Sequence, residues 1–310
     1  YSMNSKLRFV LWIVNNFFQS EFDGKVNIAR ERKKAAFRSY LGQLFFSKKF
    51  AVKYINDFLI EGIQVRQYKI SKEPFQKAII FFHGGGFSFY NILSHDDVAR
   101  RLCAMNNCTV ISVDYRLAPE FTFPAAHQDA FRVIESIALN ASDFGIDPSK
   151  IIVAGDSAGA NISACACHYF KNNQQVKIAA QILIYPWVDG KLKTASIEQF
   201  AKGYLLTKES IIWYRKTYAP NAVDWINPGL SPYYHKDFSQ LPPAFILTAQ
   251  YDPLKDDGLL YSEKLLAAGN TVCYKEYKSV VHGFINLPGI AKEGVEAYRD
   301  IQEFCKKNVP

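Results

Sequence analysis

The sequence predicts an α/β fold with a mostly parallel central sheet, helices on both faces and a helical cap. Three observations support this prediction. Six short apolar runs, each suited to a buried strand, alternate with longer helical stretches. Two glycine-rich turns each follow one of these runs, and two further helical segments fall outside the alternation. A length of 310 residues is enough for one large domain with a lid.

The strand-like runs are rich in β-branched residues, which favour strands. In chain order, the six runs cover residues 78–82, 108–114, 151–154, 180–185, 244–248 and 272–277. Two earlier runs, near 58–60 and 64–70, predict antiparallel strands at one edge of the sheet. We find no internal repeat and no low-complexity tract in the sequence.

The first motif that carries chemistry is Gly-Asp-Ser-Ala-Gly at residues 155–159, between the run at 151–154 and a segment of small residues suited to a helix. The pattern G-x-S-x-G places a serine on a tight strand-to-helix turn. Gly155 and Gly159 lack the Cβ atoms that would collide across such a turn, and Ser157 must take a strained backbone conformation. This context predicts that Ser157 is a nucleophile.

The second motif is His-Gly-Gly-Gly-Phe at residues 83–87, directly after the run at 78–82. Turns of this HGGG type supply backbone amides that stabilise an oxyanion. A nucleophile and a set of amide donors complement each other, so the two motifs together predict a serine hydrolase. We expect His83 to brace the glycine loop rather than to transfer protons.

A serine hydroxyl needs a base to take its proton and a carboxylate to orient that base. In chains of this pattern the order is serine, then acid, then histidine. Asp252 follows the run at 244–248 and His282 follows the run at 272–277, so both match that order. Asp256 and Asp257 are rivals for the acid, but they lie at a predicted helix start, where carboxylates commonly cap the N-terminus.

The remaining histidines are expected in other roles. His95 and His127 are expected at helix starts or on the surface. His168 lies on the predicted helix after Ser157, where we expect packing or solvation. His235 does not follow a final strand, which leaves His282 as the candidate base.

Five segments together resemble the hormone-sensitive-lipase family of α/β-hydrolases, which includes many bacterial carboxylesterases. They are residues 83–87, 114–120 (Asp-Tyr-Arg-Leu-Ala-Pro-Glu), 123–126 (Phe-Pro-Ala-Ala), 155–159, and 252–254 with 282–284. The resemblance implies an α/β-hydrolase fold in which the amides of Gly85, Gly86 and Ala158 form an oxyanion hole. It also implies that residues 114–120 buttress the glycine loop. The sequence departs from the family at Ala160, where members often have a second glycine.

The predicted catalytic core covers residues 53–187 and 220–310, and the resemblance implies that residues 1–52 and 188–219 form a helical cap over the site. Apolar residues recur at helical spacing near the N-terminus, at Leu7, Val10, Leu11, Val14, Phe17 and Phe18. We expect this face to pack on the core. The alternative is that it shapes an acyl pocket or touches a lipid surface.

These features predict a carboxylic ester hydrolase that acts on short- to medium-chain acyl or aryl esters and needs neither a metal nor an organic cofactor. The side chains expected at the entrance to the site are Phe87, Phe89, Tyr90, Trp187 and Phe284. Two alternatives stay open. One is an amide hydrolase or deacetylase with the same triad. The other is a non-catalytic small-molecule receptor on this scaffold, against which the presence of His282 counts.

The formal net charge of +8 comes from scattered basic residues, with short clusters only at 30–34 and 48–49. We therefore expect no nucleic-acid partner and at most weak contact with anionic membranes. The apolar run near the N-terminus has no cleavage site and is shorter than a membrane span of about 20 residues, which favours a cytoplasmic enzyme. The six cysteines show no disulfide framework and are expected to be free and buried. Cys165, Cys167 and His168 do not share one helix face, so no metal site is predicted.

Overall fold

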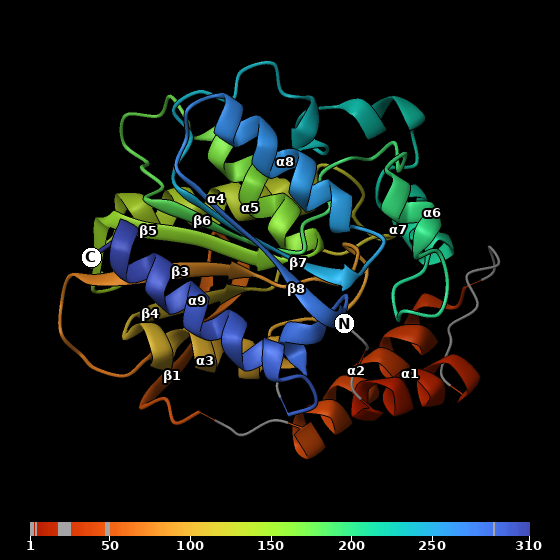
Figure 1. The fold of residues 1–310 in the computed structure, drawn as a ribbon. Coiled ribbons are helices and arrows are strands. Elements are labelled where there is room, and N and C mark those ends of the chain that lie inside the picture. The colour runs from red at the N-terminus through yellow and green to blue at the C-terminus, as the bar shows by residue number, and fades with distance from the viewer. Residues whose placement is uncertain (1–2, 4, 18–25, 47–49, 288) are drawn as a thin grey trace.

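The computed structural model describes residues 3, 5–17, 26–46, 50–287 and 289–310. In this part of the chain, eight strands form one sheet in the order β1-β2-β4-β3-β5-β6-β7-β8 (Figure 1). The strands are β1 (Tyr54–Ile60), β2 (Ile63–Lys69), β3 (Gln76–Phe82), β4 (Thr109–Val113), β5 (Ile146–Asp156), β6 (Ala180–Ile184), β7 (Ala244–Tyr251) and β8 (Val272–Val281).

The strand directions confirm the predicted α/β class. The six strands from β4 to β8 in the sheet order are parallel, whereas β1 and β2 pair antiparallel at one edge. The register aligns Phe82 of β3 with Gly155 of β5, and Asp156 of β5 with Ile184 of β6. The carboxyl ends of these three strands therefore meet at one edge of the sheet, where ligands bind in open α/β sheets.

Helices cover both faces of the sheet, as expected. The longer ones in the core are α3 (Asp96–Asn106), α4 (Ala125–Leu139), α5 (Ala158–Tyr169), α8 (Lys255–Ala267) and α9 (Lys292–Asn308). Figure 1 shows α4, α5 and α8 on one side of the sheet and α3 and α9 on the other. Alternation along β3 explains this arrangement, because Ile80 and Phe82 belong to the apolar cluster under α4, α5 and α8, and Ile79 and Phe81 belong to the cluster under α3 and α9.

The segments outside the alternation are helical, as the sequence predicts. They contain α1 (Ser5–Phe17) and α2 (Ile28–Phe46) before the sheet, and α6 (Ala195–Gln199) and α7 (Lys208–Tyr218) between β6 and β7. All four helices lie at the same side of the molecule (Figure 1). The Asn15 side-chain amide donates to the carbonyl of Gly203 at 3.1 Å, so the N-terminal part contacts the second insert. The short 3₁₀ helices are η1 (Leu93–His95), η2 (Ala222–Ile226), η3 (Pro232–Tyr234) and η4 (Phe284–Asn286).

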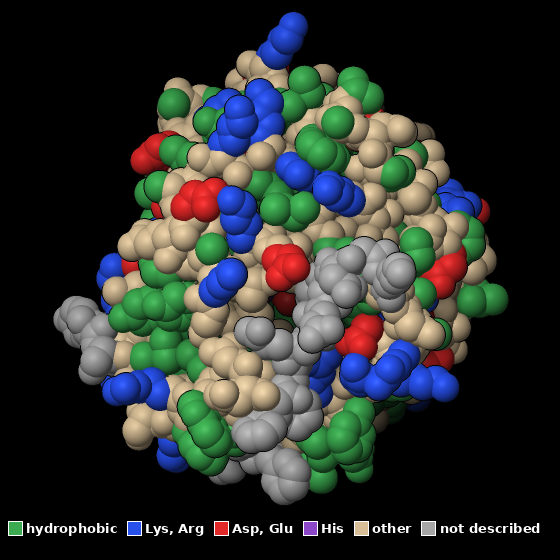
Figure 2. All heavy atoms as spheres, turned by 90° about the vertical axis from the view of Figure 1, so that its right-hand side faces the viewer, with side chains coloured by type: hydrophobic (Ala, Val, Ile, Leu, Met, Phe, Trp, Pro, Cys, Tyr) green, Lys and Arg blue, Asp and Glu red, His purple; other side chains and the backbone are tan. Residues whose placement is uncertain are grey.

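The apolar face of α1 packs against the protein. Leu7 and Leu11 are buried in the same cluster as α3 and α9, whereas Phe9 and Trp12 on the opposite face are 61% and 55% exposed. The side chain of Phe17 and all of Phe18 lie outside the described residues. Figure 2, which looks onto this side of the molecule, shows hydrophobic and basic side chains on its surface. None of the helices within the described ranges is long and apolar enough to cross a membrane.

Candidate active site

Ser157 stands at the junction of β5 and α5, in the strained turn that the sequence predicts. Its backbone has φ 56° and ψ −113°, a conformation that non-glycine residues rarely adopt. A Cβ on Gly155 would lie 2.3 Å from the carbonyl carbon of Gly159, and a Cβ on Gly159 would lie 1.9 Å from the oxygen of Phe82. Both glycines are therefore required by close backbone contact. The Ser157 amide donates to the carbonyl of Ile184 at 2.8 Å, which fixes the turn against the end of β6.

Asp252 and His282 follow the ends of β7 and β8 and form a hydrogen-bonded pair. His282 Nδ1 lies 2.7 Å from Asp252 Oδ2. The other carboxylate oxygen accepts the Leu254 amide at 2.8 Å, so the fully buried Asp252 is held from two directions. The His282 ring lies 4.4 Å from the ring of Tyr185, the residue after Ile184. His282 and Ser157 are thus both positioned against the end of β6.

The rival acids are used elsewhere. Asp256 and Asp257 lie in the first turn of α8, the helix start that the sequence predicts, although the N-cap residue of this helix, Leu254, makes no side-chain capping hydrogen bond. Asp256 accepts the Ser196 amide at 2.9 Å. Asp257 accepts the amides of Val188 and Asp189 at 3.0 and 3.1 Å. Both carboxylates accept hydrogen bonds from backbone amides of the insert that contains α6, and these bonds connect the insert to the core.

The expectation that His127 lies at a helix start is correct, but it is not on the surface. It is in the first turn of α4 and fully buried, with Nδ1 2.9 Å from the Tyr218 hydroxyl and Nε2 2.9 Å from Asn161 Oδ1. Burial lowers the pKa of His127 to about 4, so the ring is neutral. His168 has the packing role expected of it, with its ring stacked 3.8 Å from that of His235.

His83 braces the glycine loop. Its ring stacks on Tyr115 at 4.4 Å, and the Tyr115 hydroxyl donates to the His83 carbonyl at 2.6 Å. Burial lowers the pKa of His83 to about 3, which leaves it uncharged at neutral pH. Ala118 also supports the glycine loop, because its amide donates to the carbonyl of Phe87 at 2.8 Å. Residues 114–120 therefore support the loop, as the resemblance implies.

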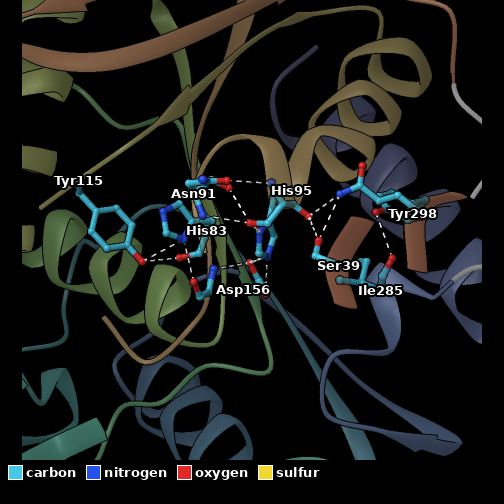
Figure 3. A network of polar contacts seen from close by, with 11 residues as sticks. Ser39, His83, Asn91, His95, Tyr115, Asp156, Ile285 and Tyr298 are labelled. Atoms are coloured by element: carbon cyan, nitrogen blue, oxygen red, sulfur yellow. Dashed lines mark hydrogen bonds and ion pairs between the residues drawn. The ribbon is translucent and has the colours of Figure 1, made fainter. Parts of the chain in front are cut away.

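A polar network connects α2 to the glycine loop through His95 (Figure 3). Ser39 Oγ donates to the Ser94 carbonyl at 3.1 Å, and Ser94 Oγ lies 2.9 Å from His95 Nδ1. His95 Nε2 lies 3.2 Å from Asp156 Oδ1, which also accepts the Gly84 amide at 2.8 Å. His95 lies at a helix start, one of the two places expected for it, but it is buried. The sequence gives no signal for its pairing with Asp156, because the two residues are distant in the chain.

The charge on Asp156 is favoured by its partners. Burial raises the pKa of this carboxyl, but the nearby His95 ring and the Gly84 amide outweigh that effect and hold the pKa below its usual range. An ionised Asp156 accepts a stronger hydrogen bond from Gly84. The residue before the nucleophile therefore positions the glycine loop opposite it.

The glycine loop presents its amides in a conformation that only glycine tolerates well. Gly85 and Gly86 have φ of 111° and 60°, and a Cβ on Gly86 would lie 2.3 Å from Cγ of Tyr214 on α7. Tyr214 therefore lies directly against the glycine loop. In the described part of the chain, no hydrogen bond uses the amides of Gly85, Gly86 or Ala158 as donors. These three amides are available to a substrate oxygen.

A small cavity with a volume of about 30 Å³ lies beside Ser157. Its lining consists of Gly86, Phe87, Ser157, Ala158, Trp187, Leu206, Ile211, Tyr214, Arg215 and Leu254. Two of the expected aromatic residues, Phe87 and Trp187, are in this lining. Leu206, Ile211, Tyr214, Arg215 and Leu254 were not anticipated, although the spacing of positions 211, 214 and 215 on one helix face is the signal that could have indicated them.

Three aromatic residues expected at the entrance lie elsewhere. Phe89 packs on the rings of Trp213 and Tyr214, at 5.9 and 5.8 Å, behind the part of α7 that lines the cavity. Tyr90 is partly exposed, with its ring 5.7 Å from that of His95. Phe284 is fully buried near Tyr185 and Tyr277, because η4 turns the chain after His282 toward the cluster under α9.

Five cysteines are buried and free, but Cys273 is exposed, contrary to expectation, because it lies on β8 at the edge of the sheet. In the ranges that the structure describes, no group of three or more His, Cys, Asp or Glu residues could hold a metal ion.

Comparison with known families matches residues 79–286 to the family described as the alpha/beta hydrolase fold. The chain belongs to the α/β-hydrolase fold family. The match spans all three candidate catalytic residues and both glycine-rich motifs. It confirms the predicted fold class and the resemblance to the hormone-sensitive-lipase and carboxylesterase type.

Similar proteins are named as ester hydrolases. The carboxylic ester hydrolase LipN of Mycobacterium tuberculosis is 37% identical over 243 residues, 75% of this chain and 65% of LipN. An arylesterase of Saccharolobus solfataricus is 36% identical, over 74% of this chain and 76% of that protein. A solved hyperthermophilic esterase from Pyrobaculum calidifontis superposes with a TM-score of 0.93 at 33% identity, over 99% of both chains. The prediction of a serine hydrolase of the carboxylesterase class is confirmed at this level.

Proposed function

We propose that the chain hydrolyses short- to medium-chain acyl or aryl esters through Ser157, His282 and Asp252. The observation that carries this proposal is the His282–Asp252 pair, at 2.7 Å, beside the strained serine turn. The pair and the turn come from three separate strand ends, and the sheet brings them to the same edge. That is the arrangement a nucleophile, a base and an orienting acid require.

The first step is attack of Ser157 Oγ on the ester carbonyl carbon while His282 takes the hydroxyl proton. Asp252 accepts a hydrogen bond from the Nδ1–H group of His282, which leaves Nε2 as the atom that receives the proton from serine. His282 then gives this proton to the leaving alcohol. Water repeats the sequence on the acyl-enzyme and releases the acid.

The charge that develops on the carbonyl oxygen is stabilised by backbone amides. Gly85, Gly86 and Ala158 offer donors that no described group uses. Loss of one such donor typically costs about 3 to 4 kcal/mol of transition-state stabilisation. The His95–Asp156–Gly84 hydrogen bonds hold the loop that presents two of these amides.

The cavity favours small acyl groups. Its volume of about 30 Å³ holds only a few atoms, and apolar side chains from α7 and from the loop before it form one wall. An acetyl or propionyl group fits with little change, whereas longer chains require the α7 wall to move. We therefore expect the highest kcat/KM with short acyl chains.

A panel of 4-nitrophenyl esters and 4-nitroanilides of increasing acyl length tests this proposal. We expect turnover of the acetate and butyrate esters, a decline with longer acyl chains, and little turnover of anilides. Labelling at Ser157 by an alkyl phosphonate probe, located by peptide mass analysis, identifies the nucleophile. Faster turnover of anilides than of esters would instead favour the amide-hydrolase alternative, and a chain that binds the esters without hydrolysing them would favour a receptor.

A further inference from the structure

Helix α2 directs three polar side chains toward the chain that follows the glycine-rich turn. Arg32, Ser39 and Gln43 lie on one face of the helix, because their spacing matches two and three helical turns. They donate to backbone carbonyls within residues 88–94, over distances of 2.8, 3.1 and 3.0 Å. None of the three lines the cavity beside Ser157. Helix α2 therefore contacts the catalytic loop from outside the cavity.

The guanidinium of Arg32 connects the glycine loop to the segment that buttresses it. Nε donates to the Ser88 carbonyl and Nη2 to the Ala118 carbonyl, both at 2.8 Å. Nη1 and Nη2 also form a bidentate pair with the Glu120 carboxylate, at 2.8 Å. This ion pair contributes little by itself, because the Glu120 side chain is about half-exposed. Within the described residues, no other donor reaches either carbonyl, so these two charge-assisted bonds are the contacts that depend on Arg32.

The Ser88 carbonyl is coupled to the Gly86 amide through two planar peptides. The first peptide contains the Ser88 carbonyl and the Phe89 amide, and that amide donates to the Gly85 carbonyl at 3.0 Å. The second peptide contains the Gly85 carbonyl and the Gly86 amide. Both peptides are trans, so each carbonyl and its amide point in opposite directions. The bond that holds the Gly85 carbonyl therefore also sets the direction of the Gly86 amide, a candidate oxyanion donor.

The loop depends on such outside contacts because its backbone is strained. Phe87 has φ 59°, in the left-handed region that non-glycine residues rarely adopt. A conformation of this kind persists only where the surrounding structure holds it in several places. Arg32 contacts the carbonyl of the next residue, Ser88. It also contacts Ala118, whose amide donates to the Phe87 carbonyl at 2.8 Å.

We propose that Arg32 is a positioning residue of the oxyanion hole, which orients the Gly86 amide through the Ser88 carbonyl. This inference rests on the proposed ester hydrolysis at Ser157, because the Gly86 amide is needed only when charge develops on a carbonyl oxygen. Without Arg32 the loop is held less firmly, and the transition state loses stabilisation. Binding of the intact ester depends on the cavity walls and changes little, so the loss falls on kcat.

Arg32→Met tests this role, because it keeps most of the length of the side chain and removes every donor. The measurement is turnover of 4-nitrophenyl acetate per active site, counted by complete phosphonate labelling. We expect kcat to fall by about 10- to 100-fold with KM changed by less than about threefold, since a small displacement of a catalytic group can cost about 10²-fold. Arg30→Met is the matched control on the same helix. Its side chain is exposed and has no described contact, so wild-type values are expected.

Two ketone inhibitors report on the oxyanion hole directly. Ser157 adds to the carbonyl carbon of trifluoromethyl ethyl ketone while His282 takes the serine proton, and the adduct places a negative oxygen in the oxyanion hole. Methyl ethyl ketone has a similar shape and binds without stable addition. We expect the preference for the fluorinated ketone, measured as the ratio of inhibition constants, to fall by about tenfold or more in Arg32→Met and to stay constant in Arg30→Met. A purely structural role would lower the melting temperature without changing this ratio.

Arg32→Lys separates the carbonyl contacts from the ion pair. Lysine keeps the charge next to Glu120 but has a single donor group in place of the guanidinium fork, so a loss of kcat of about threefold or more is expected. Circular dichroism checks the fold of each variant, and Arg32→Lys decides the matter if Arg32→Met does not fold. Wild-type kcat and ketone preference in a folded Arg32 variant, or a loss confined to KM, overturns the inference and leaves ester hydrolysis standing. If the wild-type chain neither hydrolyses 4-nitrophenyl acetate nor discriminates between the ketones, both proposals fail.

Discussion

The two walls of the cavity beside Ser157 are built in different ways. On the core side, Gly86, Ser157 and Ala158 follow the ends of β3 and β5, and their positions are determined by strand register and by glycines that no other residue can replace. On the other side, which we name the cap wall, Ile211 and Arg215 belong to α7, and Arg215 donates to the carbonyl of Gly190. We therefore expect the core wall to supply the chemistry and the cap wall to supply substrate choice through its side chains.

The largest expected effect comes from the core wall. Ser157→Ala removes the nucleophile and leaves the packing of the turn nearly unchanged, because alanine also fits beside Gly155 and Gly159. We expect kcat/KM for 4-nitrophenyl butyrate to fall by about 10⁴-fold or more. The melting temperature should stay close to that of the wild-type chain, and phosphonate labelling should be lost. A folded variant with full turnover, or labelling at another serine, would place the nucleophile elsewhere.

The next effect distinguishes the acid from its neighbours on α8. Asp252→Asn keeps the shape of the side chain but favours the wrong tautomer of His282, so kcat is expected to fall by about 10³- to 10⁴-fold. Asp256→Asn is the matched control, because the described contacts of its carboxylate are with the Ser196 amide and the Lys255 side chain and not with His282. Activity in this control should stay within about threefold of the wild-type value. Equal losses in the two variants would contradict the assignment of Asp252.

The difference between the core wall and the cap wall also explains which features could be predicted from the sequence. All eight strands were anticipated, because each carries a short apolar run, but β5 begins at Ile146 rather than at residue 151. Residues 147–150, which follow Ile146, are polar apart from Pro148, and such residues carry no strand signal. The serine turn was predictable in detail, since close backbone contact requires glycine at two fixed positions.

The cap wall and the long-range polar contacts could not be predicted in this way. Ile211 and Arg215 lie on an ordinary helical pattern, and only tertiary packing decides which face meets the cavity. Phe284 was expected at the entrance from its place beside His282, but the direction of η4 buries it. The His95–Asp156 contact joins two distant segments, and no local pattern marks it.

A substitution that enlarges the cavity tests whether the cap wall limits the length of the acyl chain. Ile211→Ala removes part of the apolar cap wall and should admit a longer chain. We expect the ratio of kcat/KM for 4-nitrophenyl hexanoate to that for the acetate to rise by about tenfold, the lower end of the range for a single methylene in a hydrophobic pocket. Ile212→Ala, on the same helix but outside the lining, should leave the ratio unchanged. An unchanged ratio in Ile211→Ala would show that α7 does not limit acyl length.

The smallest expected effect concerns Asp257, which connects the second insert to the core, and it appears in stability rather than in catalysis. Asp257 is buried on α8 and accepts the amides of Val188 and Asp189, where the second insert leaves the core. Burial raises its pKa from 3.8 to about 8, against the opposing effect of these amides. Between these two pH values the folded chain holds a proton that the unfolded chain has lost, so this group's stabilisation is complete below about pH 4 and is lost as pH rises through about 8.

Asp257→Asn keeps an acceptor oxygen for both amides and removes the titration. The difference in melting temperature between the variant and the wild-type chain should therefore change in the variant's favour by at least about 3 °C from pH 5 to pH 9. Calorimetry across this range measures the difference, with Asp256→Asn as the control for a neighbouring carboxylate. Parallel melting curves for Asp257→Asn and the wild type would mean that this carboxyl does not titrate there. Asp257 holds the chain at the point where the second insert leaves the core. If Asp257→Asn also changed the acyl-length preference, the core would determine substrate choice as well as chemistry.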